Sequence, residues 1–401
     1  MAEWIRPSVA FWHTFCGNGA DPFGGATKFW PWRAPELSAM EQAEAAMRAN
    51  FELLDKLGLD FWAFHDRDIA PAGATLRESN ANLDKIANLA SKLQVQTGVR
   101  PLWGTAQLFA EPQYMHGAAT SPQASVFARA SAQAKKAMEV THLLGGENFV
   151  FWGGREGYTS LLNTDMGREQ EHLAQFLKMA AAHKRKIGFK GTLLLEPKPK
   201  EPMLHQYDWD VATTLSFLRA HGLEKDYKIN IETNHATLAG HTMVHEMETA
   251  RLAGVLGSVD ANTGDSLTGW DTDQFLTEPR ETARIMSVVL KNGGLAPGGF
   301  NFDAKLRRES VDVEDLVLAH VAGVDTLARG LRAAVAIQED GRLAKLVTDR
   351  YASYDSGLGA KIEAGQIGWT ELEAWALEHD EQADHLSGKL ELYERIEAQF
   401  I

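Results

Sequence analysis

The chain has 401 residues, of which 44% are hydrophobic and 23% are charged, and its formal net charge is −14. These values are typical of a globular protein and exclude a disordered chain, while the acidic balance opposes binding to nucleic acids or to an anionic membrane. The single Cys16 cannot form an internal disulfide. The first residues show no charged leader followed by a long apolar stretch, and no run approaches the roughly 20 apolar residues of a membrane helix. We therefore expect a cytoplasmic protein.

Eight short strand-like runs follow one another along the chain, with helical segments between them. The runs cover residues 8–13, 60–65, 99–106, 148–154, 192–197, 228–232, 257–262 and 298–303. Apolar residues repeat on one helical face in 75–93, and 167–186 is rich in helix formers. This alternation favours an α/β fold of the TIM type, a closed (β/α)8 barrel. A doubly wound open sheet also fits the pattern but usually has fewer units.

The chain after residue 335 has no strand-like run, and its helical segments carry few apolar positions for their length. Such helices have little stability alone. We predict a barrel domain over residues 1–335 and a C-terminal helical arm over residues 336–401. The arm either packs on its own barrel or embraces a second subunit.

Polar side chains collect where the predicted strands end. In TIM barrels the carboxyl ends of the strands form the rim that carries the active site. A single carboxylate at a strand end is usually a helix cap or half of a surface ion pair, whereas a ring of such groups predicts a functional site. The rim residues are His13, His65, Asp66, Asp68, Trp103, Thr105, Trp152, Glu196, Lys198, Glu232, His235, Asp260 and Asp303.

Two sets of candidate metal ligands can be assembled at this rim. The first is made of oxygen donors alone, which suit magnesium or manganese, and comprises Glu196, Glu232, Asp260 and Asp303. The segment GWDTD supplies two more carboxylates, although acidic turns of this kind are common by themselves. A second set with nitrogen and oxygen donors, which also tolerates cobalt, comprises Glu232, His235, Asp271 and Asp273. Glu232 is expected to bridge two cations.

His65 and Lys198 are candidates for handling a substrate directly. Asp68 follows His65 by three residues and can hold one ring nitrogen, which leaves the other free for a substrate proton. Lys198 can polarise a carbonyl or hydroxyl oxygen. Taken alone, such a histidine is more often a core or capping residue, and a loop lysine is usually solvated. The expected cavity walls are Trp12, Trp103, Phe109 and Trp152, whose faces suit a sugar as well as plain core packing.

Ten segments of the chain resemble the xylose isomerase family, most closely its longer-chain class. They are SVAFWHTF, DPFG, FHDRDIAP, WGTAQLF, FWGGREGY, LLLEPKPKEP, IETNHATLAGH, GSVDANTGD, GWDTDQF and GGFNFDAKLRR, in order from about residue 8 to about residue 335. The resemblance implies a metal-dependent interconversion of D-xylose and D-xylulose, and of D-glucose and D-fructose. It also implies a homotetramer of barrels with C-terminal helical arms.

The resemblance further implies a role for each matched residue. His65 with Asp68 would assist ring opening, and Lys198 would bind the carbonyl oxygen of the substrate. The all-oxygen set would hold a structural cation and the mixed set a catalytic one, each of them Mg²⁺, Mn²⁺ or Co²⁺. Phe23 of DPFG would reach into the pocket of a neighbouring subunit. The substrate pocket would be formed by Trp12, Phe23, Trp103, Thr105, Phe109 and Trp152.

Two features depart from the longer-chain class. About seven residues precede the first strand here, whereas that class usually has several dozen, which affects the subunit contacts that such a leader makes. Gln107 stands where many relatives have asparagine, next to Thr105, and this change bears on sugar preference. The residues alone leave open whether hydrogen moves between C1 and C2 as a hydride or through an enediol, and the resemblance favours the hydride shift.

Two other classes of protein share part of this pattern. A different divalent-metal barrel enzyme, such as a ketose epimerase or an enzyme that cleaves abasic DNA, would also need a carboxylate ring. The DNA enzyme would require a basic groove, which a net charge of −14 opposes. A non-catalytic sugar-binding barrel would have lost an acidic ligand, His65 or Lys198, and all are present. The chain has no G-x-G-x-x-G fingerprint between a strand and a helix, so a nicotinamide cofactor is not implied.

Overall fold

The computed structural model describes residues 2–379 and 386–401. Within this part of the chain, eight parallel strands close into a barrel in the order β1-β12-β9-β8-β6-β4-β3-β2. The strands are β1 (Pro7–Ala10), β2 (Phe61–His65), β3 (Arg100–Thr105), β4 (Asn148–Trp152), β6 (Thr192–Glu196), β8 (Tyr227–Glu232), β9 (Leu256–Asp260) and β12 (Phe300–Phe302). The predicted (β/α)8 barrel is confirmed, and the open sheet is excluded.

Seven of the predicted strands end within two residues of the observed ends, but the first was predicted too long. β1 stops at Ala10, and the chain turns at once into a short π-helix, Trp12–Cys16. The turn places the Phe15 ring 5.2 Å from the Phe11 ring, and both side chains are buried in the core. Burial of these two rings explains why the chain turns here. The turn also carries Trp12 and His13 onto the rim.

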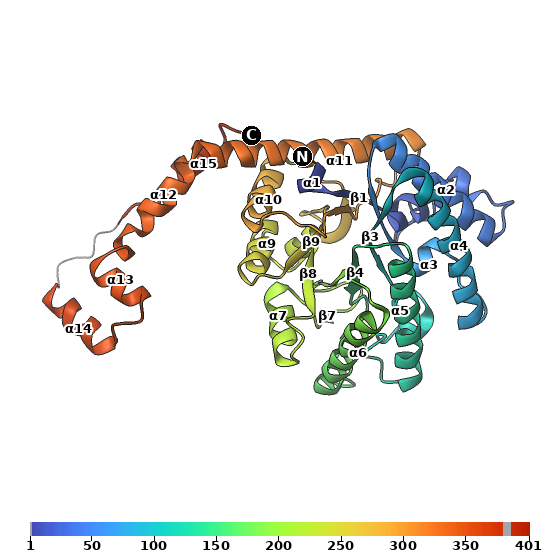
Figure 1. Cartoon of the computed structure of the whole chain (residues 1–401), viewed down its shortest axis with the longest axis horizontal. Coiled ribbons are helices and arrows are strands. Elements are labelled where there is room, and N and C mark those ends of the chain that lie inside the picture. Colours follow the sequence, from blue (N-terminus) through green and yellow to red (C-terminus); the bar gives the residue numbers. More distant parts are fainter. Residues whose placement is uncertain (1, 380–385) are drawn as a thin grey trace.

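Helices surround the barrel (Figure 1), and both helical segments predicted from the sequence, 75–93 and 167–186, are helical in the structure. The main ones are α2 (Ala39–Leu57), α4 (Leu76–Thr97), α5 (Ala124–Leu143), α6 (Met166–Ile187), α7 (Val211–Ala220), α9 (Met243–Leu252), α10 (Pro279–Asn292) and α11 (Val313–Asp340). α4 continues beyond its predicted end at residue 93 because its stop signal, Gly98 at φ +77°, lies further along the chain. No helix among the described residues is long and apolar enough to cross a membrane.

The strands are buried on both faces, which explains their apolar sequences. Every residue of β2 and of β9 is buried, including the terminal His65 and Asp260. Short helices continue from two of the strand ends: α3 (Asp66–Ile69) carries Asp68, and α8 (Thr233–Leu238) carries His235. A further short helix, α1 (Ala2–Ile5), precedes β1. The strand ends and short helices therefore place the predicted rim residues on rigid elements.

Two small antiparallel sheets lie outside the barrel. β10 (Thr263–Asp265) pairs with β11 (Trp270–Gln274), and this hairpin carries Asp271 and Asp273. β5 (Gly157–Tyr158) pairs with β7 (His205–Gln206). Short 3₁₀ helices cover Pro31–Arg33, Pro112–Tyr114 and Ala352–Tyr354.

The C-terminal helices form an arm that extends from the barrel (Figure 1). Helix α11 packs along α10, and the chain then changes direction at Gly341, where φ is +72°. α12 (Arg342–Tyr351), α13 (Gly357–Glu363) and α14 (Trp369–Glu378) lead away, and α15 (Leu390–Glu397) lies back against the base of the arm. α15 is anchored by Glu397, whose carboxylate accepts hydrogen bonds of 2.6 and 2.7 Å from Arg284. Residues 380–385 of the predicted arm lie outside the described part of the chain.

Candidate active site

The register of neighbouring strands brings the predicted rim residues side by side. Glu232 at the end of β8 is paired with Asp260 of β9. Trp152 of β4 is likewise paired with Glu196 of β6. Because the strands are parallel, these pairs all lie at the carboxyl end of the barrel.

The all-oxygen set is assembled in the structure. Each of its four carboxylates offers one oxygen, and these oxygens all lie within 4.8 Å of one another; the residues are Glu196, Glu232, Asp260 and Asp303. All four side chains are buried. Oxygen donors in this number and spacing suit a hard divalent cation.

Three buried asparagines, none of them predicted as a site residue from the sequence, orient these carboxylates. Asn230 donates at 2.9 Å to Glu196 and at 2.9 Å to Asp260. Asn262 donates to Glu232 at 2.6 Å, and Asn301 donates to Asp260 at 3.0 Å. Hydrogen bonds of this kind fix the ligand oxygens of a metal site. Their only sequence signal was the polar residue close to the end of an otherwise apolar strand.

The mixed set is assembled around the shared Glu232. Oxygens of Glu232, Asp271 and Asp273 lie within 4.8 Å of one another. His235 Nε2 lies 3.0 Å from Glu232 Oε2 and 3.2 Å from Asp271 Oδ2. His235 Nδ1 donates to the carbonyl oxygen of Pro197 at 3.0 Å, which orients the ring so that Nε2 points toward the carboxylates. Asp273 has a φ of +45°, in the left-handed region that residues other than glycine adopt uncommonly.

The electrostatics of the rim favour a bound cation. Burial raises the pKa of Glu232 well above its usual range, and the charges of Asp271 and Asp303 raise it further. Burial and the neighbouring charge of Glu196 act on Asp260 in the same way and raise its pKa. Burial and the charge of Asp271 raise the pKa of Asp273 to about 7. A divalent cation would reverse these shifts, because it stabilises the ionised carboxylates that surround it.

Two basic residues with no role predicted from the sequence, His13 and Lys305, contact these carboxylates. His13 Nε2 lies 2.8 Å from Asp303 Oδ1 and 3.4 Å from Asp273 Oδ2. Lys305 Nζ lies 2.8 Å from Asp273 Oδ2. His13 was visible among the rim residues, but its partners depend on the turn after β1 and could not be derived from the strand pattern.

Lys198 is buried and faces the mixed set. Its ammonium group forms an ion pair with Asp271 and lies 5.3 Å from the centre of the Trp152 ring. Burial alone would lower the pKa of Lys198, but the charges of Asp271 and Glu232 outweigh it, so the pKa is raised. Lys198 is therefore a fixed cation beside the cavity.

His65 stands on the other side of the cavity and is held by Asp68. Its Nδ1 lies 2.7 Å from Asp68 Oδ2. Burial alone would lower the pKa of His65, but the hydrogen bond and charge of Asp68 outweigh it and raise that pKa. The Trp12 ring lies 4.4 Å from the imidazole and the Phe109 ring 5.6 Å from it, so Nε2 is left for a ligand in the cavity.

A cavity of about 200 Å³ is enclosed by these groups. Its floor and walls are formed by Trp12, His13, His65, Trp103, Thr105, Phe109, Val150, Trp152, Glu196, Lys198, Glu232, His235, Asp271, Asp273 and Asp303. Thr105 Oγ1 donates to the Val150 carbonyl at 2.5 Å, so this hydroxyl presents only acceptor capacity to the cavity. Asp68 and Asp260 lie behind the lining residues and support them.

Phe23 does not line this cavity within a single chain. Its side chain is 78% exposed and stacks on the Trp270 ring at 5.5 Å. Both rings border an outer groove that leads away from the rim. The predicted insertion of Phe23 into a neighbouring subunit stays a prediction.

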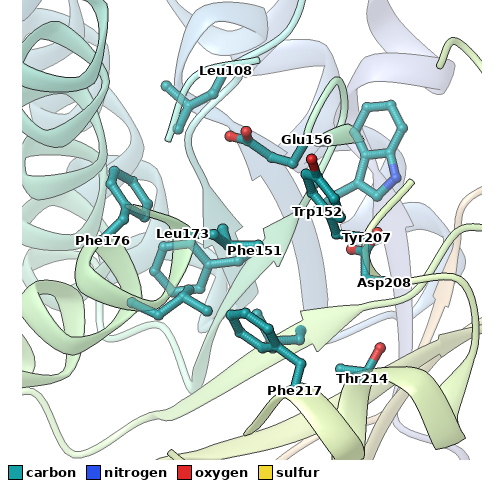
Figure 2. A pocket seen from close by; sticks show the side chains of 13 residues that line it. Leu108, Phe151, Trp152, Glu156, Leu173, Phe176, Tyr207, Asp208, Thr214 and Phe217 are labelled. Carbon is teal, nitrogen blue, oxygen red and sulfur yellow. The ribbon is translucent and has the colours of Figure 1, made fainter. Parts of the chain in front are cut away.

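Trp152 lies between the cavity of about 200 Å³, called the sugar-sized cavity below, and a smaller one of about 50 Å³. Figure 2 shows Phe151, Leu173 and Phe176 on one side of this smaller cavity and Trp152 and Asp208 on the other. Glu156, also at this cavity, accepts hydrogen bonds from the loop that contains Ala119 and Thr120. Asp208 Oδ1 is buried without a hydrogen-bond partner in the described part of the chain, and burial raises the pKa of this carboxyl to about 8.

The fold and the rim together define a TIM barrel with paired clusters of metal-ligand type at its carboxyl end. Comparisons with known proteins identify the family more closely. The chain is 63% identical to xylose isomerase of Arabidopsis thaliana over 99% of its own length and 83% of that protein. It is 54% identical to xylose isomerase of Rhodopirellula baltica over 100% of its length and 91% of that protein. The chain belongs to the xylose isomerase family.

A family model matches part of the chain, and two solved structures share its fold. The model of the XylA2 C-terminal domain matches residues 347–401, within the arm. A putative xylose isomerase from Rhodospirillum rubrum has the same fold, with a TM-score of 0.56 and 16% identity over 81% of this chain and 98% of that one. A 3-keto-D-glucoside 4-epimerase from E. coli also shares the fold, with a TM-score of 0.53 and 13% identity over 81% of this chain and 98% of that one.

Proposed function

We propose that the protein is an aldose-ketose isomerase that interconverts D-xylose and D-xylulose, and also D-glucose and D-fructose. The observation that carries this proposal is the position of Glu232, which belongs to both ligand clusters at the wall of a sugar-sized cavity. Membership of the xylose isomerase family agrees with it.

We propose Mg²⁺, Mn²⁺ or Co²⁺ as the two cations. Glu196, Glu232, Asp260 and Asp303 would hold one, and Glu232, His235, Asp271 and Asp273 the other, in line with their donor types. Such cations supply Lewis acidity to the oxygens of an open sugar.

The residues around the cavity would open the sugar ring and orient the chain. In ring opening the O1 hydroxyl loses its proton, the bond between C1 and the ring oxygen breaks, and the ring oxygen gains a proton. His65 would move this proton through Nε2 while Asp68 holds Nδ1. Lys198 would donate to the carbonyl oxygen of the open sugar, and the aromatic walls would exclude water.

We propose that isomerisation then proceeds by a hydride shift. The hydrogen on C2 of the aldose moves with its electron pair to C1, and the O2 hydroxyl proton passes to O1, so the aldehyde becomes an alcohol and C2 becomes a ketone. The reaction is an internal redox exchange and needs no outside oxidant.

A coupled assay of D-xylulose formation from D-xylose, with and without EDTA, tests the proposal. We expect conversion that EDTA abolishes and added Mg²⁺ or Mn²⁺ restores. A metal-dependent ketose epimerase would instead convert D-xylulose into its C3 epimer and form no aldose. A sugar-binding barrel would bind xylose without turning it over. Either of these results would overturn the proposal.

We further propose a homotetramer in the cytoplasm, with residues 336–401 as the arm that embraces a second subunit. Helix α11 crosses residue 335 and ends at Asp340, so Gly341 offers a natural pivot between barrel and arm. α12 and α14 bury no residue within the single chain. Trp369 of α14 is 91% exposed, as expected of a side chain that a second subunit covers.

A further inference from the structure

A second group of histidines and carboxylates lies outside the proposed active site. It consists of His241, in the turn between α8 and α9, His245 and Glu246 of α9, and Asp210, the residue before α7. We propose that these four residues, named here the outer cluster, bind a zinc-type transition-metal cation that is distinct from the two cations of the rim.

Three members of the outer cluster place donor atoms close together, and the fourth, Asp210, contacts His241. His241 Nε2 lies 3.1 Å from Asp210 Oδ2 and 3.9 Å from Glu246 Oε1. His241, His245 and Glu246 each offer an atom within 4.8 Å of the others, and the two imidazole rings stack at 4.7 Å. Ligands bound tetrahedrally at about 2.0 to 2.1 Å from zinc lie about 3.3 Å apart, so small side-chain movements would complete the site.

Each carboxylate of the outer cluster accepts a backbone hydrogen bond on one oxygen and turns the other oxygen toward His241. Asp210 Oδ1 accepts from the Thr213 amide at 2.7 Å, and Glu246 Oε2 accepts from the Val211 amide at 2.8 Å. Glu246 is only 4% exposed, yet within the described part of the chain its Oε1 accepts no hydrogen bond and faces His241. A carboxylate oxygen that accepts no hydrogen bond from the protein is available as a metal ligand.

The donor types define which cation would bind. Two imidazoles with two carboxylates suit zinc, and also cobalt or nickel, whereas magnesium and manganese prefer oxygen donors. His245 is exposed and His241 partly exposed, so a cation can enter from solvent. A cavity of about 10 Å³, bordered by Asp210 and Glu246 on one side and by Glu232 and His235 on the other, separates the outer cluster from the rim.

Zinc content measures the site directly. The wild type and the His241→Ala/His245→Ala variant would be dialysed against Zn²⁺ with a large excess of Mg²⁺, which occupies the oxygen-rich rim. We expect the variant to retain about one zinc ion per chain fewer than the wild type. His221→Ala is the matched control. The His221 ring packs on Phe217 and lies near Glu171, neither of which belongs to the outer cluster, so this variant should keep the zinc content of the wild type.

Two further measurements keep the proposal testable if the double variant folds poorly. The exposed His245 alone, changed to alanine, should lower zinc affinity at this site at least tenfold without loss of the fold. In crystals soaked with Zn²⁺, anomalous scattering should show a peak between His241 and Glu246. Equal zinc content in wild type and variants, or no peak at this position, would overturn the proposal. The Mg²⁺-supported isomerase rate of these variants reports separately on the function proposed above.

Discussion

Gln107 Nε2 donates to Asp68 Oδ1 at 2.8 Å, while Asp68 Oδ2 lies 2.7 Å from Nδ1 of His65. The Asp68 carboxylate thus connects the Gln107 amide to the His65 imidazole. We propose that this imidazole acts at the ring oxygen of the sugar. Gln107 does not line the sugar-sized cavity. Gln107 therefore contacts the residue that holds His65 rather than the cavity wall.

Replacing Gln107 by leucine should lower kcat by roughly 10- to 100-fold, the usual effect of removing a partner that orients a functional group. Loss of the amide would free Asp68 to rotate and would shift the pH profile that His65 governs, because Asp68 raises the pKa of His65. Gln107→Asn, which keeps an amide, is the control and should lose less. Wild-type rates and pH profiles in both variants would refute a role for this contact.

His65→Asn should slow the reaction of the cyclic sugar but leave measurable turnover. Open-chain sugar forms slowly in water, and the remaining rim residues still act on it. The residual rate and its dependence on the starting anomer are the quantities to measure. An inactive variant that binds two cations and sugar normally would mean that His65 takes part in the hydrogen transfer itself, and the hydride shift would have to be given up.

Glu232→Gln should weaken both rim cations and abolish turnover, whereas Asp273→Asn should weaken mainly the cation of the mixed set. The reason is geometric, since Glu232 belongs to both clusters and Asp273 to one. Isothermal titration with Mn²⁺ resolves the two sites. Unchanged affinity for both cations in Glu232→Gln would contradict the bridging role.

Asp208→Asn should change how the stability depends on pH. Burial raises the pKa of Asp208 to about 8, so the folded protein keeps a proton that the unfolded chain loses above about 3.9. The stabilisation is complete below pH of about 3.9, falls by about 1.4 kcal/mol per pH unit above it, and is gone beyond pH of about 8. Because asparagine does not titrate, the unfolding midpoint of the variant should rise relative to wild type between pH 5 and pH 8. Parallel midpoints across this range would contradict the buried protonated carboxyl.

If the proposed tetramer forms, deleting residues 342–401 should leave smaller species. The deletion removes α14 and α15, whose Trp369 and Leu390 are 91% and 69% exposed in the single chain. Sedimentation of both proteins at micromolar concentration measures the effect, and Trp369→Ser tests a single contact. A full-length protein that sediments as a monomer would refute the proposed assembly.

The barrel could be predicted from the sequence because its strands are buried on both faces, so that apolar runs end abruptly on charged residues such as Glu196 and Glu232. The register then places the ligands together without further information. The turn at Trp12–Cys16 was missed because its aromatic residues suit a strand equally well. It needed the tertiary packing of Phe11 on Phe15 to be recognised.

Contacts between side chains from distant segments could not be predicted in the same way. Asn230 and Asn262 resemble ordinary polar residues near a strand, and their hydrogen bonds to Glu196 and Glu232 depend on neighbouring strands. The outer cluster joins Asp210 with His241, which lie on different elements, and no local spacing connects them. Local sequence patterns thus predicted the rim residues, whereas the residues that orient them could be identified only from the folded structure.

Diffraction from crystals soaked with Mn²⁺ and D-xylose tests the two-cation isomerase most directly. We expect two anomalous peaks at the rim that share Glu232, with an open sugar beside them, Lys198 at its carbonyl oxygen and Trp152 against its carbon chain. A single peak at the rim, or a sugar bound away from Glu232 and Lys198, would contradict this proposal.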